Sequence, residues 1–365
     1  MPVSLFDTNT PLAPLRPRLI EAMTAVVEDG RFILGPNVAA FEQEFAAYCG
    51  ADHGIGVGNG TDALTIALRA IGVGPGDEVI VPSFTFYASA EAIPPTGATP
   101  VFCDIDPETF CITPETVKAV MTPRTKAVVA VHLFGNVAPV AEIEALGVPV
   151  VEDAAQAAGT TTPHGRPGAL GTVATFSFFP SKNLGCFGDG GMIMTRDAEV
   201  AERARMLRFH GSHDKVTYEH VGYNSRLDEV QAAVLRVMLP ELDGWADGRR
   251  AAAAHYEAAG LGELVDLPQP TPGTEPAWHL YVVKHERADE LAATLKERGI
   301  GHKAYYRTPV HRQPAMADLG AGADLPATDE VARTHLAIPM SPVLDAEQAA
   351  EVTDAVRAFA AAPAA

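Results

Sequence analysis

The sequence predicts an α/β protein whose large domain is a mainly parallel sheet covered by helices. Two observations support this fold class. From residue 78 onward, short β-rich runs alternate with helical segments, and most of those runs are apolar throughout instead of alternating between apolar and polar residues. Strands of that composition are buried on both faces, which is typical of a parallel sheet between layers of helices.

The chain before residue 78 is predicted to form two helices and then a strand–turn–helix unit. Residues 15–50 carry apolar residues at helical spacing, with a break at the glycine- and proline-containing segment 30–36. A short strand then enters a glycine turn around Gly60, and we expect Thr61 or Asp62 to cap the following helix. The N-terminus of such a helix can bind an anion, and a plain helix cap is the alternative interpretation.

Six further strands are predicted in the large domain. They are Glu78–Pro82, Thr99–Asp104, Ala127–Leu133, Val148–Glu152, Val173–Phe178 and Gly191–Thr195. The chain becomes helical from about residue 200, and Asp228 and Glu229 favour the start of a helix there.

A second, smaller domain of α+β type is predicted at the C-terminus. An Ala-rich, charged helix at 241–260 leads into it, followed by a strand at His279–Val283, a helix at Ala288–Arg298 and a final helix from Asp345. The tail that ends Ala360-Ala361-Ala362-Pro363 has no core pattern and is expected to fray. We therefore expect a large domain at residues 1–240 and a small one at 241–365.

Composition and charge exclude several classes of protein. With 47% hydrophobic residues the chain is an ordinary globular protein, and its net charge of −19 argues against nonspecific binding to nucleic acid or to an anionic membrane. No apolar run is long enough to span a membrane, and the first residues lack the pattern of a signal peptide. The four cysteines form no CxxC pair and no metal-ligand cluster, so we expect a cytoplasmic protein without a metal, although an even count leaves a disulfide possible.

Polar side chains gather at the carboxyl ends of the predicted strands, where ligands of open α/β sheets bind. Tyr87, Asp153, Gln156 and Ser177 each follow such a strand, and Lys182 lies between an aromatic run and a loop with four glycines. Partial burial lowers the pKa of a lysine and leaves a nucleophilic amine that can form a Schiff base. A lysine with its head in water is the alternative interpretation of that position.

Pyridoxal phosphate requires this set of groups together. Its aldehyde needs the amine of Lys182, and its pyridine nitrogen needs the carboxylate of Asp153 to stay protonated. The turn Gly60-Thr61-Asp62 and the hydroxyl of Ser177 supply donors for its phosphate. Gln156 can donate to the phenolate oxygen, and the ring of Tyr87 can cover one face of the cofactor.

The sequence resembles, nearly end to end, the sugar aminotransferases of the DegT/DnrJ/StrS family. The matching stretches are Gly35-Pro36, Gly60-Thr61-Asp62-Ala63-Leu64, Gly74-Pro75-Gly76-Asp77-Glu78-Val79-Ile80, Glu152-Asp153-Ala154-Ala155-Gln156, Ser181-Lys182-Asn183-Leu184-Gly185, Gly188-Asp189-Gly190-Gly191 and Asn224-Ser225-Arg226-Leu227-Asp228. The resemblance implies the aspartate aminotransferase-like architecture of fold-type I pyridoxal-phosphate enzymes.

The resemblance also implies roles for individual residues. Lys182 would be the Schiff-base lysine, Asp153 the pyridinium partner and Gln156 the contact to O3′. Tyr87 would stack on the ring, and Thr61, Asp62 and Ser177 would hold the phosphate. Asn224 would reach the phosphate from the other subunit, so the minimum assembly would be a homodimer with shared active sites.

The activity implied is transfer of an amino group, usually from glutamate, through pyridoxamine phosphate to a keto sugar on a nucleotide diphosphate. The stretch around Asn224 looks most like members that aminate C3, whereas members that aminate C4 more often carry an aromatic at Ser225. In the loop where members often read Tyr-Pro-x-Pro-Leu-His, this chain departs at Arg307. Tyr306 and His311 are substrate-side candidates, and Arg307 is either a contact to a diphosphate or sugar acid or a solvated arginine.

Three other functions stay open from the sequence. A branch of the family has a histidine in place of the lysine and dehydrates its substrate, but Lys182 is present here. Amination of a keto-cyclitol would use the same site. A regulator that binds pyridoxal phosphate without catalysis would be expected to carry a DNA-binding module, and no basic helix-turn-helix segment precedes residue 15.

Overall fold

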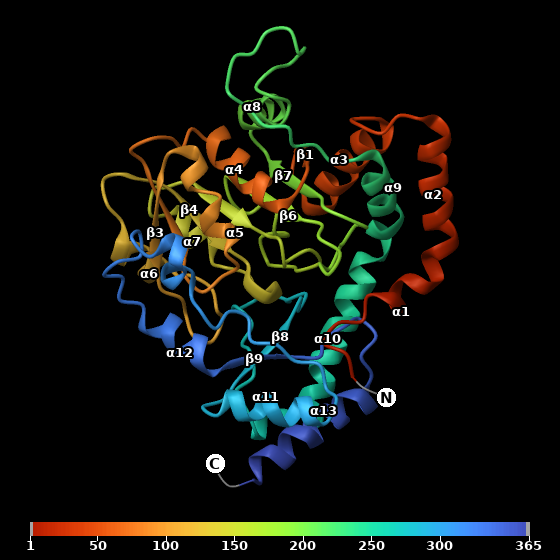
Figure 1. Ribbon diagram of the computed structural model, residues 1–365, viewed down its shortest axis with the longest axis vertical. Helices are drawn as coiled ribbons and strands as arrows, with labels where there is room; N and C mark the ends of the chain where they lie inside the picture. Colours follow the sequence, from red (N-terminus) through yellow and green to blue (C-terminus); the bar gives the residue numbers. More distant parts are fainter. Residues whose placement is uncertain (1–2, 363–365) are drawn as a thin grey trace.

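The computed structural model describes residues 3–362 and is built around one seven-stranded sheet (Figure 1). In spatial order the strands are β1 (His53–Val57), β7 (Gly191–Thr195), β6 (Val173–Ser177), β5 (Val150–Asp153), β4 (Thr125–Val131), β2 (Glu78–Pro82) and β3 (Thr99–Cys103). The pairs from β6 to β3 are parallel, and β7 runs antiparallel to both of its neighbours. The mainly parallel sheet predicted from the sequence is thereby confirmed.

The sheet is buried on both faces, as its apolar strands predict. Successive residues of β6 and β7 enter two different cores, with Val173 and Ile193 on one face and Phe176 and Met192 on the other. Helices α4 (Gly60–Ala70) and α8 (Ala198–Arg208) pack on the first face, and α3 (Pro36–Cys49) packs on the second with α9 (Glu229–Met238).

The remaining helices connect strands or extend the chain. They are α1 (Asn9–Leu12), α2 (Arg16–Asp29), α5 (Ala88–Glu91), α6 (Pro114–Val120), α7 (Val140–Glu144), α10 (Leu242–Ala258), α11 (Ala288–Glu297), α12 (Pro326–Thr334) and α13 (Ala346–Ala360). Asp345 caps α13 in a capping box with Gln348, where the sequence predicts the final helix to start.

Helix α9 starts at Glu229, directly after Asp228, as the sequence predicts. The Glu229 carboxylate has a further role that was not predicted: it accepts hydrogen bonds from the backbone N–H groups of Asn37 and Val38, at 2.9 and 2.8 Å, and so caps α3. A Cβ at Gly35 would lie 2.7 Å from this carboxyl group. The Gly35-Pro36 pair therefore lets a distant glutamate reach the start of α3.

The C-terminal part forms a small two-stranded sheet with helices around it, at the lower end of the molecule in Figure 1. Its strands are β8 (Tyr281–Lys284) and β9 (His335–Ile338), and β9 was not predicted. The N-terminal residue Val3 packs into this core, and its carbonyl accepts from the N–H of Gly301 at 2.7 Å. The N-terminal segment thus joins the small core from the opposite end of the chain, and a domain boundary near residue 241 stays a prediction.

Residues 363–365, which include the end of the tail expected to fray, lie outside the described residues, as do residues 1–2. Within residues 3–362 we find no helix of the length and apolarity that a membrane span requires.

Candidate active site

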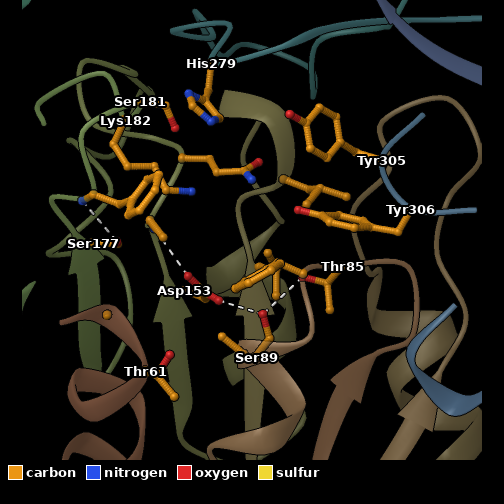
Figure 2. Close-up of a pocket in the computed structure, with 18 of the residues that line it drawn as sticks. Thr61, Thr85, Ser89, Asp153, Ser177, Ser181, Lys182, His279, Tyr305 and Tyr306 are labelled. Atoms are coloured by element: carbon orange, nitrogen blue, oxygen red, sulfur yellow. Dashed lines mark hydrogen bonds between the residues drawn. The ribbon is translucent and has the colours of Figure 1, made fainter. Parts of the chain in front are cut away.

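A cavity of about 970 Å³ lies at the carboxyl ends of β4, β5 and β6 (Figure 2). The large sheet supplies its floor and one side, with the predicted residues Thr61, Asp153, Ser177 and Lys182. Its upper wall comes from elsewhere in the chain, from Phe6 and from the residues His279, Leu280, Lys303, Ala304, Tyr305, Tyr306, Arg307, Thr308 and Gln313. The site therefore lies between the large sheet and the C-terminal part.

Lys182 presents a nucleophilic amine to this cavity. It follows β6 in a tight turn, in which its backbone N–H donates to the carbonyl of Phe179 at 2.8 Å. Burial lowers the pKa of the amine to about 8, while the negative charge of Asp153 acts in the opposite direction. About a tenth of the amine is therefore uncharged at pH 7, far more than at an ordinary lysine, and this is the form that attacks a carbonyl carbon.

Asp153 ends β5 and faces the same cavity. Its Oδ2 accepts from the hydroxyl of Ser89 at 2.7 Å, and its Oδ1 accepts from the backbone N–H of Ala155 at 3.3 Å. The Ser89 hydroxyl is in turn 3.0 Å from that of Thr85. These contacts fix a carboxylate at the bottom of the cavity, opposite the lysine, as Figure 2 shows.

The N-terminus of α4 forms the anion end of the cavity, but its cap differs from the prediction. Asn59, not Thr61 or Asp62, caps the helix by accepting from the N–H of Asp62 at 2.8 Å. At Gly60, a Cβ would lie 2.7 Å from the Cβ of Ser177. The glycine thus allows the helix N-terminus and the Ser177 hydroxyl to converge on one point.

Asp62 has both of its candidate groups engaged within the protein. Its backbone N–H is used by the cap, and its Oδ2 accepts from the hydroxyl of Ser225 at 2.6 Å. Ser225 also accepts from the N–H of Gly58 at 2.9 Å and is buried, so it supports the start of α4. The donors that α4 offers to an anion are consequently those of Gly60 and Thr61.

Gln156 and Tyr306 are brought together from the two parts of the chain. The side-chain oxygen of Gln156 accepts from the N–H of Phe134 at 2.6 Å, which leaves its NH2 group to donate. Burial is the main cause that raises the pKa of the Tyr306 hydroxyl, while a hydrogen bond with Gln156 acts in the opposite direction. Both residues line the cavity, as expected of a cofactor contact and a substrate-side group.

Tyr87 is not placed where the stacking role requires it. Phe86 lines the cavity and is exposed, whereas Tyr87 immediately precedes α5 and packs against the main core. The ring available to cover a ligand is therefore Phe86, one position earlier. The sequence placed two aromatic residues side by side, and the start of α5 decides which of them turns inward.

Arg307 and His311 are held by contacts within the protein. Arg307 lines the cavity, but its guanidinium donates to Asp289 at 2.6 Å and to the carbonyls of Ala332 and Arg333 at the end of α12. His311 is buried, with its Nδ1 2.6 Å from the hydroxyl of Ser83, and it is not part of the cavity wall. The structure thus supports neither the solvated arginine nor a direct substrate contact from His311 in this chain.

Asn224 is exposed and is not part of the cavity wall of its own chain. It pairs in a β-bridge with Phe209, at the base of the loop that projects from the top of the molecule in Figure 1. Its expected contact with a phosphate in the other subunit stays a prediction.

Several residues of the cavity wall were missed by sequence reasoning. Thr85, Ser89, Ser181, His279 and Lys303 line the cavity, as do Phe6 and Tyr305. Ser181 and Ser89 lie within two residues of predicted site residues, so their positions after the strand ends could have indicated them. His279 and Lys303 follow no local signal, because the tertiary fold brings them to the sheet edge from beyond residue 240.

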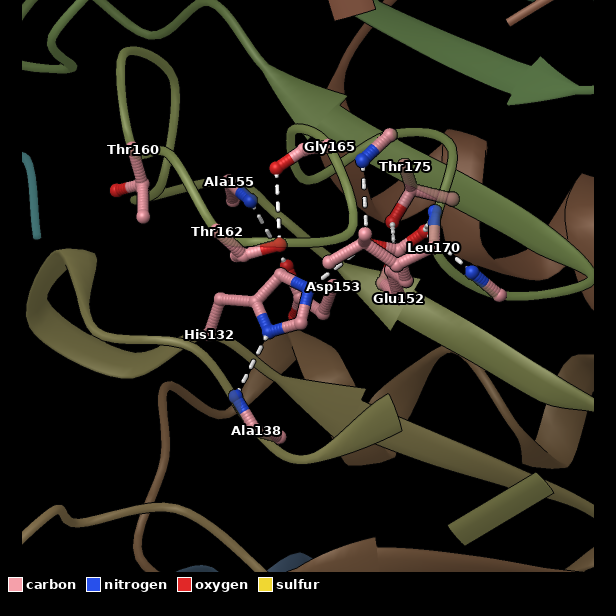
Figure 3. Close-up of polar contacts among 12 residues, drawn as sticks. His132, Ala138, Glu152, Asp153, Ala155, Thr160, Thr162, Gly165, Leu170 and Thr175 are labelled. Carbon is pink, nitrogen blue, oxygen red and sulfur yellow. Dashed lines mark hydrogen bonds and ion pairs between the residues drawn. The ribbon is translucent and has the colours of Figure 1, made fainter. Parts of the chain in front are cut away.

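Behind β5, on the side away from the cavity, lies a second polar cluster (Figure 3). The buried carboxylate of Glu152 accepts from His132 Nε2 at 2.9 Å, from Gly168 N at 3.1 Å, and from Leu170 N and Gly171 N at 2.9 Å each. His132 Nδ1 accepts from the N–H of Ala138 at 3.2 Å, so the ring proton lies on Nε2. Every polar atom of this pair has a partner.

The cavity fits pyridoxal phosphate by the chemistry of its donors. It combines an amine of lowered pKa, a carboxylate, an amide, an aromatic ring and a helix N-terminus that lies close to Ser177 because Gly60 has no Cβ. The parallel sheet, with the lysine beyond one strand and the carboxylate at the end of its neighbour, is that of fold-type I pyridoxal-phosphate enzymes. Fold and site together thus define this class of protein.

Comparison with known sequences narrows the class to a family. The DegT/DnrJ/EryC1/StrS aminotransferase family matches over residues 15–357, and the chain belongs to that family. It is 47% identical, over 98% of this chain and 96% of the relative, to the dTDP-3-amino-3,4,6-trideoxy-alpha-D-glucose transaminase of Streptomyces venezuelae. It is 46% identical, over 98% and 99%, to a pleiotropic regulatory protein of Geobacillus stearothermophilus.

A solved structure extends this likeness to the fold. The crystal structure of S. venezuelae DesV in complex with a ketimine intermediate superposes with a TM-score of 0.94 at 46% identity, and the match covers 100% of both chains.

Proposed function

We propose that this protein transfers an amino group from an amino-acid donor, glutamate, to the C3 keto group of a deoxysugar carried on a nucleotide diphosphate. Pyridoxal phosphate is the cofactor, with pyridoxamine phosphate as its aminated form. The observation that carries the proposal is the amine of Lys182, with a pKa lowered to about 8, opposite the carboxylate of Asp153 in one cavity. Family membership and the 47% identical sugar transaminase support it.

The residues of this chain would hold the cofactor as follows. Lys182 would bind the aldehyde carbon, Asp153 the pyridine nitrogen and Gln156 the phenolate oxygen. Thr61 and Ser177 would bind the phosphate at the start of α4. When bound, the cofactor supplies an electron sink for the bond broken next to the amino group.

Lys182 also serves as the proton carrier of the site. Once its amine is free, its uncharged form can accept a proton and its ammonium form can return it, and a pKa near 8 keeps both forms accessible. Asp153 favours the ammonium form and burial favours the amine, so the two effects together set this balance.

The size of the cavity suits a substrate larger than the cofactor alone. At about 970 Å³ it lies at the upper end of the range for ligand pockets. Tyr305 and Lys303 stand at its upper wall, with the Lys303 ammonium 4.8 Å from the centre of the Tyr305 ring. An aromatic ring with a cation over it suits a nucleotide base and its diphosphate, respectively.

The choice of C3 over C4 rests on the relative of S. venezuelae, whose name gives a 3-amino product, and on the stretch around Asn224. Because Ser225 is buried against Asp62, an aromatic at that position would change the start of α4, and so the phosphate end of the site. Amination at C4 of a 4-keto-6-deoxy sugar, or of a keto-cyclitol, is the alternative.

A homodimer with shared sites completes the proposal. Phe179 and Phe86 line the cavity and are nevertheless 52% and 55% exposed, so the wall is open on their side. Phe32 and Phe187 are exposed as well, at 49% and 45%. We propose that a second copy covers these rings and contributes its Asn224 to the phosphate. We also propose a cytoplasmic protein, in line with four unpaired buried thiols.

The test begins with an absorbance spectrum of the protein after addition of pyridoxal phosphate. A visible band that is replaced by the pyridoxamine form on titration with glutamate is the expected result. Incubation of that form with 3-keto and 4-keto nucleotide sugars should then restore the band with the 3-keto acceptor. Restoration by the 4-keto acceptor alone would move the reaction to C4, and a band that ignores every amino donor would favour a regulatory role of the kind that the name of the Geobacillus relative suggests.

A further inference from the structure

The imidazole of His279 lines the cavity and has no part in the function proposed above. Its side chain is almost fully buried, and it comes from the segment before β8. Figure 2 shows it at the top of the cavity, on the side of Ser181 and Lys182. The charge of Lys182 acts on this imidazole, so the position of the ring proton affects the reacting amine.

The hydrogen bonds of Asn183 determine which ring nitrogen of His279 carries the proton. The side-chain NH2 of Asn183 donates to the carbonyls of Ala158 and Ala277, both at 3.2 Å. Both amide hydrogens therefore point away from the histidine, and the amide oxygen faces His279 Nδ1 at 3.2 Å. Since an amide oxygen can only accept, Nδ1 must carry the hydrogen.

The other ring nitrogen, Nε2, consequently carries a lone pair. Burial, together with the positive charges of Lys182 and Arg249, lowers the pKa of the imidazole well below its ordinary value, so the ring stays neutral. Among residues 3–362, no side chain or backbone group forms a hydrogen bond with Nε2. His132 behind β5 has the opposite tautomer and uses both of its nitrogens.

The ring of His279 is held firmly in this position. The buried guanidinium of Arg249 donates to the carbonyls of Trp278 and His279 at 3.1 and 3.4 Å. Phe6 stacks on the imidazole with ring centres 6.0 Å apart. The chain therefore fixes both the backbone and the ring plane of a residue whose acceptor atom is free.

Lys182 is the complementary group. Within the described part of the chain its amine forms no hydrogen bond, and the negative charge of Asp153 raises its pKa against the effect of burial. A donor without an acceptor and an acceptor without a donor thus share one cavity. In Figure 2, Asp153 lies below the lysine and His279 lies above it.

We propose that His279 is a positioning residue for Lys182: its Nε2 accepts a hydrogen bond from the free lysine amine and holds it within reach of the reacting carbon. This rests on the proposed function, in which Lys182 is the reacting amine. The bond favours the ammonium form, because a charged donor binds a neutral acceptor more strongly than a neutral donor does. No proton is transferred to the imidazole, whose Nδ1 hydrogen stays with Asn183.

The test uses the cofactor-free protein and two substitutions of similar size. His279→Asn places an amide NH2 near Nδ1 and so keeps the bond to Asn183, but it leaves nothing at Nε2. His279→Gln places an amide at the position of Nε2 and can accept there. Acetylation of Lys182 by a trace of acetic anhydride, followed by mass spectrometry across a pH series, reports the fraction of free amine.

The expected result is that His279→Asn raises the acetylation rate of Lys182 at pH 7 by roughly threefold to tenfold, since the lost bond had stabilised the ammonium. The difference should vanish at pH values well above the pKa, and His279→Gln should restore the rate of the unchanged protein. Equal rates in all three proteins, or equal changes in both variants, would overturn the proposal and leave His279 a packing residue.

A second measurement leaves His279 itself unchanged. Nitrogen-15 spectra of histidine-labelled, unchanged protein distinguish the two neutral tautomers, and Lys182→Ala identifies the ring next to the lysine by its shifted signal. The Nδ1–H tautomer is required, and an Nε2–H ring would contradict the proposal. Neither measurement uses the cofactor, so failure of the proposed function would instead show as absence of the cofactor band.

Discussion

Two neighbouring carboxylates at the end of β5 face opposite sides of the sheet and serve different purposes. Glu152 points away from the cavity and accepts four hydrogen bonds, three of them from the backbone of the segment 168–171 (Figure 3). Asp153 points into the cavity and accepts two, one of which is long at 3.3 Å. Consecutive residues of a strand face opposite ways, so one position separates the two environments.

The same contrast holds for two buried histidines. His132 uses both ring nitrogens, whereas His279 uses one. In the polar cluster behind β5, every donor and acceptor of Glu152 and His132 has a partner. This cluster holds the segment 168–171 against β5. The groups of the cavity keep donors and acceptors unused, and these remain for a ligand.

The largest effect is expected from a substitution in the cavity, where polar groups remain available for a ligand. Lys182→Ala should abolish amino transfer and the visible band of the bound cofactor, because no other amine can replace it at the carbonyl carbon. Lys303→Ala, which removes the second lysine of the cavity wall, should keep the band. Absorbance spectra of both proteins are recorded after addition of pyridoxal phosphate. A normal band in Lys182→Ala would refute the assignment of Lys182 as the Schiff-base lysine.

The two carboxylates can be separated by matched substitutions. Asp153→Asn should lower kcat/KM by about 10²–10³, the usual cost of losing one electrostatic contact to a reacting group. Its effect on stability should be small, because the Ser89 hydroxyl can rotate to serve an amide.

Glu152→Gln should show the reverse pattern. Its NH2 group would face N–H donors, so we expect the free energy of unfolding to fall by about 2–4 kcal/mol, while the folded fraction keeps its kcat/KM. Urea unfolding and steady-state kinetics of both variants provide the comparison. If both variants lose activity and stability to the same extent, the assignment of a catalytic role to Asp153 and a structural role to Glu152 is wrong.

A smaller effect is expected at the phosphate end. Gly60→Ala introduces a methyl group 2.7 Å from the Cβ of Ser177. Overpacking of this kind costs about 1–3 kcal/mol, so binding of the cofactor should weaken by roughly 5- to 150-fold. Gly244→Ala in α10, where nothing lies within 4 Å of the added atom, is the control and should bind normally. Equilibrium titrations with pyridoxal phosphate measure the dissociation constants of both variants, and equal constants would contradict the expectation.

The smallest effect concerns stability against pH. The pKa of Lys182 is lowered to about 8 from an ordinary 10.5, so between these values the unfolded chain holds a proton that the folded chain has released. The free energy of unfolding of the cofactor-free protein should therefore rise with pH over this window, by at most about 1.4 kcal/mol per pH unit. Lys182→Met should lack this contribution. Unfolding curves that stay parallel for the two proteins from pH 8 to pH 10 would contradict the lowered pKa.

Local patterns were sufficient to predict the sheet and the cavity floor. Six of the seven strands of the large sheet were placed within two residues at either end, because each is a short apolar run bounded by turn residues. Once the strands are parallel, their carboxyl ends lie at one edge. Lys182, Asp153, Ser177 and Gly60 therefore had to meet there, whatever the rest of the chain does.

What the sequence could not determine depends on contacts between distant segments. The choice of Phe86 over Tyr87 depends on where α5 begins, and His311 is buried because Ser83 bonds to its ring. Glu229 caps a helix far from its own, and His279 reaches the cavity only because Asn183 and Arg249 fix it there. Periodicity and spacing report which face of an element is apolar. They do not report which element will pack against it, and that packing decides which polar groups find partners and which remain for a ligand.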